Sequence, residues 1–320
     1  MISFKRVLFS TFALATVTLA TASFVSAQLR LPRPSQSASV MQTIGVTDIT
    51  ITYSRPGVKG RTIWGDVAPT DNYVKGDATL DDQNKRTKGM PIVPYGHVWR
   101  TGANEATQFV VTDDVMINGE KLAAGSYSLH TIPGKDEWTI VFNGTANQWG
   151  SFNYDPTKDT LRVKAKPQWL TDSQEFLIYT IDPTADNAAQ VNIRWEKLRV
   201  PFTVSVDLAA TTLAKARIAV AAAKPDDWRT PFQAAGFANQ NNDREEALKW
   251  VEQSLKILDA SIAAKPTFQN LAGKFNVLMA AGRKDEALAV AAKAIAQGKT
   301  DKVDTAALEK RGADIKAGKQ

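Results

Sequence analysis

Three arginines, Arg55, Arg61 and Arg100, lie in polar motifs that are flanked by glycine or proline. A guanidinium held in a loop can present its planar fork of donors to a carboxylate or a phosphate. We therefore expect a pocket for a small polar ligand, an anion or a sugar acid, at one end of the domain that carries these residues. The alternative is that the arginines only join loops through ion pairs, Arg100 with Glu105 and Arg61 with Asp66.

An amide and a carboxylate, Asn104 and Glu105, follow each other directly in the same motif as Arg100. In a rigid loop this pair could polarise a ligand hydroxyl, and Glu105 is the one candidate for a general acid or base. A hydrolase would need a second acid across a cleft, for which Asp66 and Asp114 are candidates. The alternative is that Asn104 and Glu105 satisfy buried backbone amides.

The chain contains two histidines, His97 and His130, and no cysteine. Thiolate chemistry, disulfides and a three-histidine zinc site are therefore excluded. A site of two histidines and Glu105 is conceivable, but His130 lies in a strand pattern typical of an ordinary packed position. The sequence has no phosphate loop, dinucleotide fingerprint or nucleophile elbow. We expect neither a metal nor a cofactor.

The tryptophans of the first two thirds of the chain could stack on sugar rings or fill a core. Trp138 and Trp195 lie within strand patterns, which predicts core positions. Trp149 lies between Gln148 and Gly150, and this setting makes it the best candidate for a surface platform.

The element that must position these residues is a β domain over residues 39–206. Hydrophobic residues alternate with threonine over residues 49–53, and Asn118-Gly119 separates two short apolar runs as a tight hairpin requires. Short strands without intervening helices predict an antiparallel β-sandwich or jelly-roll, whereas the polar stretch 71–90 reads as an exposed excursion. Further strand-like runs cover residues 108–112, 126–132, 137–142, 160–166, 175–181, 190–196 and 200–206.

From residue 207 onward the hydrophobic period becomes that of a helix. Ala-Lys-Pro at 223–225 recurs at 264–266, and Glu-Ala-Leu at 246–248 recurs at 286–288. A repeat of this length is typical of stacked helix pairs, and the pattern resembles tetratricopeptide repeats. The chain is thus expected to be an α+β multidomain protein, with an all-α helical-hairpin repeat domain over residues 207–320. This part could contact a protein partner or only cap the β domain.

Five segments of the β domain carry a family resemblance: 54–65 (SRPGVKGRTIWG), 93–107 (VPYGHVWRTGANEAT), 124–133 (AGSYSLHTIP), 137–143 (EWTIVFN) and 148–150 (QWG). Together they resemble the bacterial domain-of-unknown-function 2911 family over about residues 36–207. Members of that family are mostly exported, so the resemblance implies export. It implies no activity.

Residues 1–27 read as a secretion signal. Lys5 and Arg6 precede an apolar stretch over residues 7–25, which ends in small residues before Gln28. The alternative is a retained membrane anchor, but interspersed Thr and Ser residues disfavour it. We expect cleavage, a linker over residues 28–38, and a mature periplasmic or secreted protein without a membrane span.

Charge is spread evenly along the chain. The formal net charge is +6, and removal of Lys5 and Arg6 would leave +4. Because no dense Lys/Arg run with interleaved aromatics occurs, we expect no nucleic-acid partner.

Two functions compete on these grounds, and a purely structural envelope protein is a third hypothesis. The first is a non-catalytic binding module whose β domain holds a small polar or anionic ligand. The second is a hydrolase of carbohydrate or cell-envelope material that uses Glu105. The predicted ligand-binding residues are Arg55, Arg61, His97, Arg100, Asn104, Glu105 and Trp149.

Overall fold

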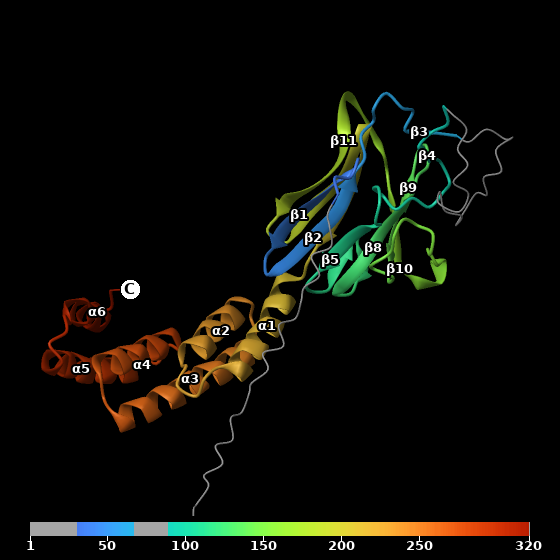
Figure 1. Ribbon diagram of the computed structural model, residues 1–320. Coiled ribbons are helices and arrows are strands. Elements are labelled where there is room, and N and C mark those ends of the chain that lie inside the picture. The colour runs from blue at the N-terminus through green and yellow to red at the C-terminus, as the bar shows by residue number, and fades with distance from the viewer. Residues whose placement is uncertain (1–30, 67–88, 320) are drawn as a thin grey trace, which may run out of the picture. The chain divides into compact units, whose positions relative to one another are not determined.

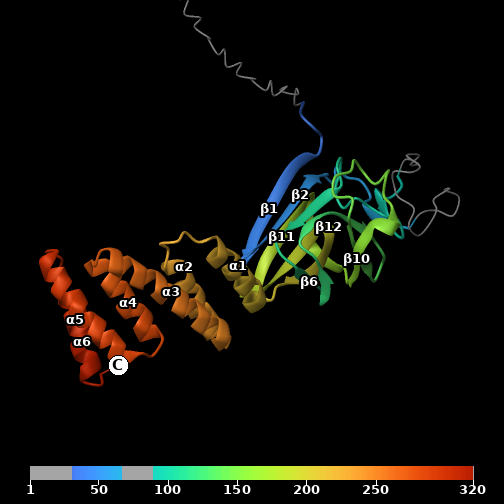
Figure 2. The ribbon, with the colours of Figure 1, turned by 90° about the horizontal axis from the view of Figure 1, so that it is seen from below.

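The computed structural model describes residues 31–66 and 89–319 (Figures 1 and 2). The expected secretion signal and most of the expected excursion at 71–90 lie outside these residues. Strands fill the first part of the described chain and six helices fill the second. This order confirms the predicted α+β class with an all-α tail.

The larger sheet has six antiparallel strands, and Figure 1 shows β8, β9 and β10 side by side within it. The smaller sheet has four strands, also antiparallel. In spatial order the six strands are β1 (Gln36–Ile44), β2 (Thr47–Arg55), β5 (Thr107–Val111), β8 (Gly125–Ile132), β9 (Trp138–Asn143) and β10 (Asp159–Ala165). The four are β11 (Gln168–Ala185), β12 (Ala188–Ser205), β6 (Val115–Ile117) and β7 (Glu120–Leu122).

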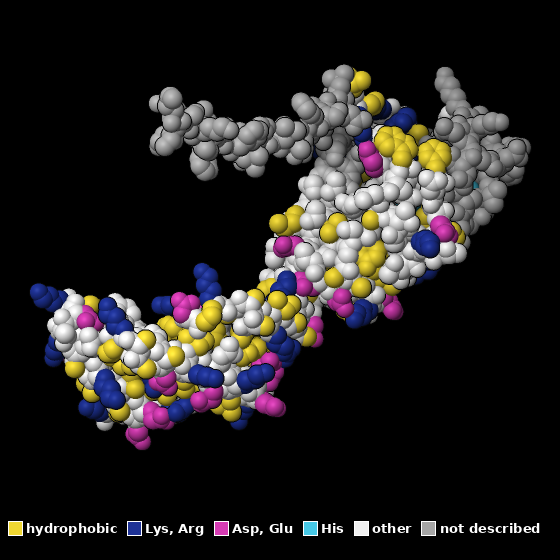
Figure 3. All heavy atoms as spheres, turned by 60° about the horizontal axis from the view of Figure 1, so that its bottom comes forward, with side chains coloured by type: hydrophobic (Ala, Val, Ile, Leu, Met, Phe, Trp, Pro, Cys, Tyr) yellow, Lys and Arg dark blue, Asp and Glu magenta, His cyan; other side chains and the backbone are white. Residues whose placement is uncertain are grey.

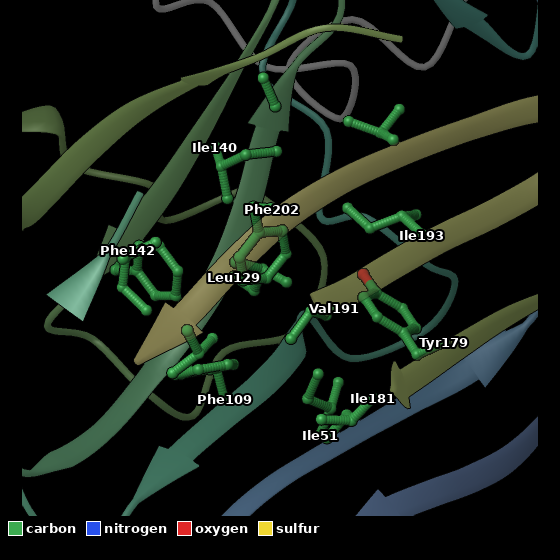
Figure 4. Packing of buried hydrophobic residues seen from close by; sticks show 14 of the residues in the cluster. Ile51, Phe109, Leu129, Ile140, Phe142, Tyr179, Ile181, Val191, Ile193 and Phe202 are labelled. Atoms are coloured by element: carbon green, nitrogen blue, oxygen red, sulfur yellow. The ribbon is translucent and has the colours of Figure 1, made fainter. Parts of the chain in front are cut away.

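The two sheets share one hydrophobic core, as expected for a sandwich (Figure 4). Phe109 and Phe142 of the larger sheet have ring centroids 5.0 Å apart. Both rings meet Phe202 of the smaller sheet, at 6.4 and 6.1 Å. Edge-to-face and tilted contacts of this kind stabilise an aromatic core beyond the area that it buries.

One local prediction from the sequence is confirmed by the structure, and one is wrong. The Asn118-Gly119 hairpin is confirmed, with φ angles of 48° and 89° in the left-handed region that such a turn needs. The runs at 190–196 and 200–206, expected as separate strands, form the single strand β12. Glu196 adopts a φ of 54°. Opposite it, β11 carries extra residues between Trp169 and Ile178, and regular pairing resumes on both sides of this irregularity.

The sheet domain also contains one short parallel pair, which the sequence did not predict. It joins β3 (Trp64–Gly65) to β4 (Val93–Pro94). β1 begins at Gln36, inside the segment 28–38 that was expected to be a linker, because the last proline before it is Pro34.

The helical part begins at Asp207, whose side chain caps the first helix by accepting a 3.0 Å hydrogen bond from the Ala210 amide. Successive helices lie side by side in both ribbon views (Figures 1 and 2) and share a second hydrophobic core, separate from that of the sheets. The helices are α1 (Leu208–Ala222), α2 (Arg229–Gln240), α3 (Arg244–Ala264), α4 (Phe268–Ala280), α5 (Lys284–Thr300) and α6 (Ala306–Lys316).

Small residues let these helices approach closely. A Cβ atom on Gly273 of α4 would lie 2.8 Å from the Trp228 ring, so only glycine leaves room for that tryptophan. The resemblance of these helices to tetratricopeptide repeats stays a prediction. No helix within the described ranges has both the length and the hydropathy needed to cross a membrane.

Candidate functional site

Arg100 is positioned by a short segment that pairs with the end of β8. The backbones of Trp99 and Thr131 exchange two hydrogen bonds, of 2.8 and 2.9 Å, in an antiparallel bridge. Trp99 points into the core. Because side chains alternate along a strand, Arg100 points to the other face, where the antiparallel register places it opposite His130.

The chain turns sharply after Arg100 at Thr101, which is fully buried with a φ of 50°. A β-branched residue rarely adopts this conformation, so its surroundings must hold it there. The Thr101 hydroxyl donates to the Trp99 carbonyl at 3.0 Å. The Thr101 carbonyl accepts from the hydroxyls of Thr107 and Tyr179, both at 2.9 Å. This turn fixes the direction in which Arg100 leaves the sheet.

The next residues pair with a segment more than 40 positions later. The Ala106 amide donates to the Gln148 carbonyl, and the Gly150 amide donates to the Asn104 carbonyl, both at 3.0 Å. Glu105 and Trp149 face each other in this bridge. Both are exposed, Trp149 to 53%, so two predicted site residues form one cross-strand pair at the surface.

A cavity of about 200 Å³ lies beside this bridge. Arg61 and Arg100 both line it, so two of the three predicted arginines share one concave surface. Trp99 and Trp195 also line it. Both are almost fully buried, and their stacked rings, with centroids 5.8 Å apart, back the cavity from the core. The complete lining is Ser35, Pro56, Arg61, Ile92, Trp99, Arg100, Gly102, Ala103, Ser151 and Trp195.

The other predicted ligand-binding residues lie outside this lining. Arg55 donates to the Leu177 carbonyl at 2.9 Å, and its guanidinium lies 5.9 Å from the Phe176 ring centroid. His97 is buried at 1% exposure. Asn104 adopts a φ of 60° and donates from its side chain to the Ser35 carbonyl at 3.0 Å, which anchors the chain just before β1.

The alternative ion pair between Arg61 and Asp66 is not formed. Asp66 pairs with Lys135 at 2.7 Å. The Arg61 guanidinium instead donates to the carbonyls of Val58 and Gly57, which holds its own loop. Arg61 therefore reaches the cavity with its charge uncompensated by a carboxylate among the described residues.

A buried polar face lies behind Arg100 and was not expected from the sequence. Residues 144–158, here called the covering segment, pack over the face of β8 that carries Ser128 and His130. The Gln148 side chain donates to the Ser128 hydroxyl at 3.0 Å, and the Tyr154 ring centroid lies 5.0 Å from that of His130. Ser128, His130 and Gln148 are all buried.

Asp159 fixes the covering segment to the sheet. Its carboxylate accepts hydrogen bonds of 2.7 Å each from Tyr154, Arg162 and Asn143. Burial, followed by the bond to Asp159, raises the pKa of the Tyr154 phenol. The cluster is internally satisfied, so its role in the site is to hold the wall in place.

Burial lowers the pKa of His130 to about 4. The negative charge of Asp159 and the nearby Ser128 backbone oppose this shift in part, whereas the positive charge of Arg100 adds to it. The imidazole is therefore neutral at pH 7. The sequence signal that was available is the shared strand face of Ser128 and His130, opposite the core residues Tyr127 and Leu129.

Within the described ranges, no three His, Cys, Asp or Glu side chains gather as a metal site would require. The groups available at the site are therefore guanidinium, imidazole, amide and aromatic side chains.

Residues 35–79 and 81–204 match the family described as "Protein of unknown function (DUF2911)", and the match spans more than half of the chain. The chain belongs to this family. Comparison with curated proteins and with solved structures gave no match. The DUF2911 match ends at residue 204, so the sheets lie inside it and the six helices lie outside it.

Proposed function

We propose that this chain is an exported, non-catalytic binding protein whose β domain holds a small anionic or polar ligand. The observation that carries the proposal is that Arg61 and Arg100, from separate segments of the chain, line one cavity. Two guanidiniums at one concave site match the geometry of a carboxylate or a phosphate.

The size and the walls of the cavity support a small ligand. Its volume of about 200 Å³ is below the roughly 300–1,000 Å³ of typical drug-sized sites. Trp99 and Trp195 offer apolar surface to the body of a ligand while the arginines meet its charge. A few polar groups set among apolar walls are the usual composition of such sites.

The origin of the lining residues gives further support. Pro56 and Arg61 belong to segment 54–65, whereas Trp99, Arg100, Gly102 and Ala103 belong to segment 93–107. These are two of the motif segments on which the family resemblance rests. Their meeting at one cavity favours a shared binding role over a merely local structural one.

The helical part is proposed to contact a protein. A groove of about 450 Å³ is lined by Trp228, Phe232, Met279 and the charged residue Arg311, together with Asn276 and Ala280. On the face shown in Figure 3, side chains of both charges lie among hydrophobic ones over the helices. Apolar surface bordered by polar groups is typical of protein interfaces.

Among the described residues, the cavity lacks the pair of acids that the hydrolase alternative requires. Such a hydrolase needs a second carboxylate about 5–9.5 Å from Glu105 on the same cleft. The described lining of the cavity contains neither Glu105 nor any other acid. Asp114, one of the two candidate partners, pairs with Lys121 at 2.8 Å.

The test is a thermal-shift and calorimetric screen of the purified protein against inorganic phosphate, simple carboxylates and sugar acids. A compound that binds the folded state raises the unfolding temperature by an amount that grows with the ratio of its concentration to its Kd. We expect Arg61→Met and Arg100→Met to abolish the shift and Arg55→Met, outside the lining, to preserve it. Equal loss in all three variants, or no shift with any anion, would refute the anion site.

A further inference from the structure

Three buried polar atoms lie where the covering segment meets β8 and lack a hydrogen bond of good geometry within the described chain: the two ring nitrogens of His130 and Gln148 Oε1. Gln148 cannot turn its amide around to remedy this, because Nε2 already donates to Ser128 Oγ and the Thr145 carbonyl. Buried groups of this kind are rare, since each costs about 1–3 kcal/mol when unsatisfied.

His130 and Gln148 do not line the proposed ligand cavity themselves but lie next to residues that do. His130 lies opposite Arg100, which lines the cavity. Ser151 lines it too, three residues after Gln148 and three before Tyr154, whose ring contacts His130. The covering segment therefore contributes Ser151 to the cavity lining and, through Tyr154, covers His130.

The chemistry of the unsatisfied atoms specifies what would satisfy them. A neutral imidazole offers one donor and one acceptor, and Gln148 Oε1 is an acceptor. A hydroxyl both donates and accepts, so hydroxyl groups suit this set, whereas a bare carboxylate or phosphate oxygen can only accept. Arg100, directly beside them, supplies the positive charge for an acid group.

We infer that the ligand is a polyhydroxy acid, such as a sugar acid, with its carboxylate at Arg61 and Arg100 and a hydroxyl at His130 and Gln148. The inference rests on the proposed function and assigns His130 and Gln148 as binding residues. His130 is fully buried, so contact between its ring and a ligand hydroxyl requires the Arg100 side chain to rotate. Side-chain rotations of this kind are common on binding.

The charged groups around His130 are compatible with a neutral imidazole in this role. Arg100 faces it from the segment before β5, and Asp159 faces it from β10. Arg162 and Tyr154 both bond Asp159, so the carboxylate is already occupied and does not compete for the imidazole. A ligand hydroxyl would thus meet a ring nitrogen whose only competing partner among the described residues is the Ser128 backbone, with which it makes no hydrogen bond of good geometry.

The experiment compares three probes on the purified full chain: D-glucuronate, cyclohexanecarboxylate and D-glucose. They carry an acid with hydroxyls, an acid alone, and hydroxyls alone on rings of similar size. We expect glucuronate to bind at least about tenfold more tightly than either of the others, the equivalent of one or two additional buried hydrogen bonds. The chain has only two histidines, so the imidazole NMR signal of His130 is assignable with one variant, and glucuronate alone should shift it.

The variants separate this inference from the proposed function. His130→Phe and Gln148→Leu should each weaken glucuronate about tenfold while changing cyclohexanecarboxylate less than about twofold. Arg100→Met should abolish the binding of both acids. His130→Gln, which keeps a donor and an acceptor, should retain part of the preference, and Arg55→Met is the matched control.

Each outcome decides between the two claims. Equal affinity for the two acids, with no shift of the His130 signal, would overturn the polyhydroxy acid and leave the anion site standing. Failure of every acid to bind would overturn both. If His130→Phe does not fold, Gln148→Leu still tests the hydroxyl contact, and an unchanged glucuronate affinity in that variant would overturn the assignment.

Discussion

The Tyr179 hydroxyl donates a 2.9 Å hydrogen bond to the carbonyl oxygen of Thr101. The two residues lie 78 positions apart, on β11 of the smaller sheet and in the turn after Arg100. Thr101 has a left-handed backbone conformation that is unfavourable for a β-branched residue. The smaller sheet therefore braces the turn that directs Arg100 into the cavity.

Removal of the Tyr179 hydroxyl should lower stability without creating a large cavity in the core. Tyr179→Phe keeps the ring and deletes one buried donor, so we expect the free energy of unfolding to fall by about 1–2 kcal/mol. Urea denaturation measures this change. An unaltered free energy would show that the bond from Thr107 alone satisfies the Thr101 carbonyl.

The left-handed conformation of Asn104 should make glycine a better replacement than alanine. Asn104→Ala loses the 3.0 Å bond to Ser35 and also strains the backbone at a φ of 60°. Asn104→Gly loses the bond alone. We expect the alanine variant to be about 1 kcal/mol less stable than the glycine variant in denaturant titrations, and the reverse order would contradict the turn geometry.

Two glycines in the helical part should respond oppositely to alanine. Gly273→Ala places a Cβ atom 2.8 Å from the Trp228 ring, so overpacking should lower the unfolding free energy by about 1–3 kcal/mol. Gly236 in α2 has open space around its Cα. Gly236→Ala should raise stability by about 0.5–1 kcal/mol, since alanine favours a helix. Thermal unfolding followed by circular dichroism reports both changes, and destabilisation of equal size would be inconsistent with this packing.

His130 should make the folded state acid-sensitive. Its pKa is about 4 in the folded chain and 6.5 ordinarily, so between these values the unfolded chain binds more protons. The free energy of unfolding should therefore fall as the pH drops from about 7 to about 4, by about 3 kcal/mol from this residue. Denaturant titrations across this range measure the slope.

Carboxylates with lowered pKa values, such as Asp114 and Glu286, add stability that is also lost on acidification. Comparison with the variant His130→Phe isolates the contribution of the histidine, because the variant keeps those carboxylates. Between pH 7 and pH 4 the variant should lose about 3 kcal/mol less unfolding free energy than the wild-type chain. An identical pH dependence in the variant and the wild-type chain would show that His130 has the same pKa in the folded and the unfolded chain.

Strand and helix content followed from local patterns. Alternation predicted β2 and β5, Asn118-Gly119 predicted the hairpin, and the change of period near residue 207 predicted the start of the helices, because all three depend on neighbours within a few residues. The division of β12 was wrong, since the left-handed residue Glu196 interrupts the alternation while β12 continues, with extra residues in the facing part of β11.

Arg55, Arg61 and Arg100 looked equivalent in the sequence because each lies in a loop-like motif. Which of them share a cavity depends on where separate loops end in space, and the fold turns Arg55 toward β11 instead. The hydrophobic pattern of the sequence also could not show that the covering segment buries the outer face of β8. Residue type and spacing thus determined the sheets, the helices and the presence of guanidinium groups in loops, whereas long-range pairing of separate segments decided that Arg100 shares a cavity with Arg61 and lies opposite His130.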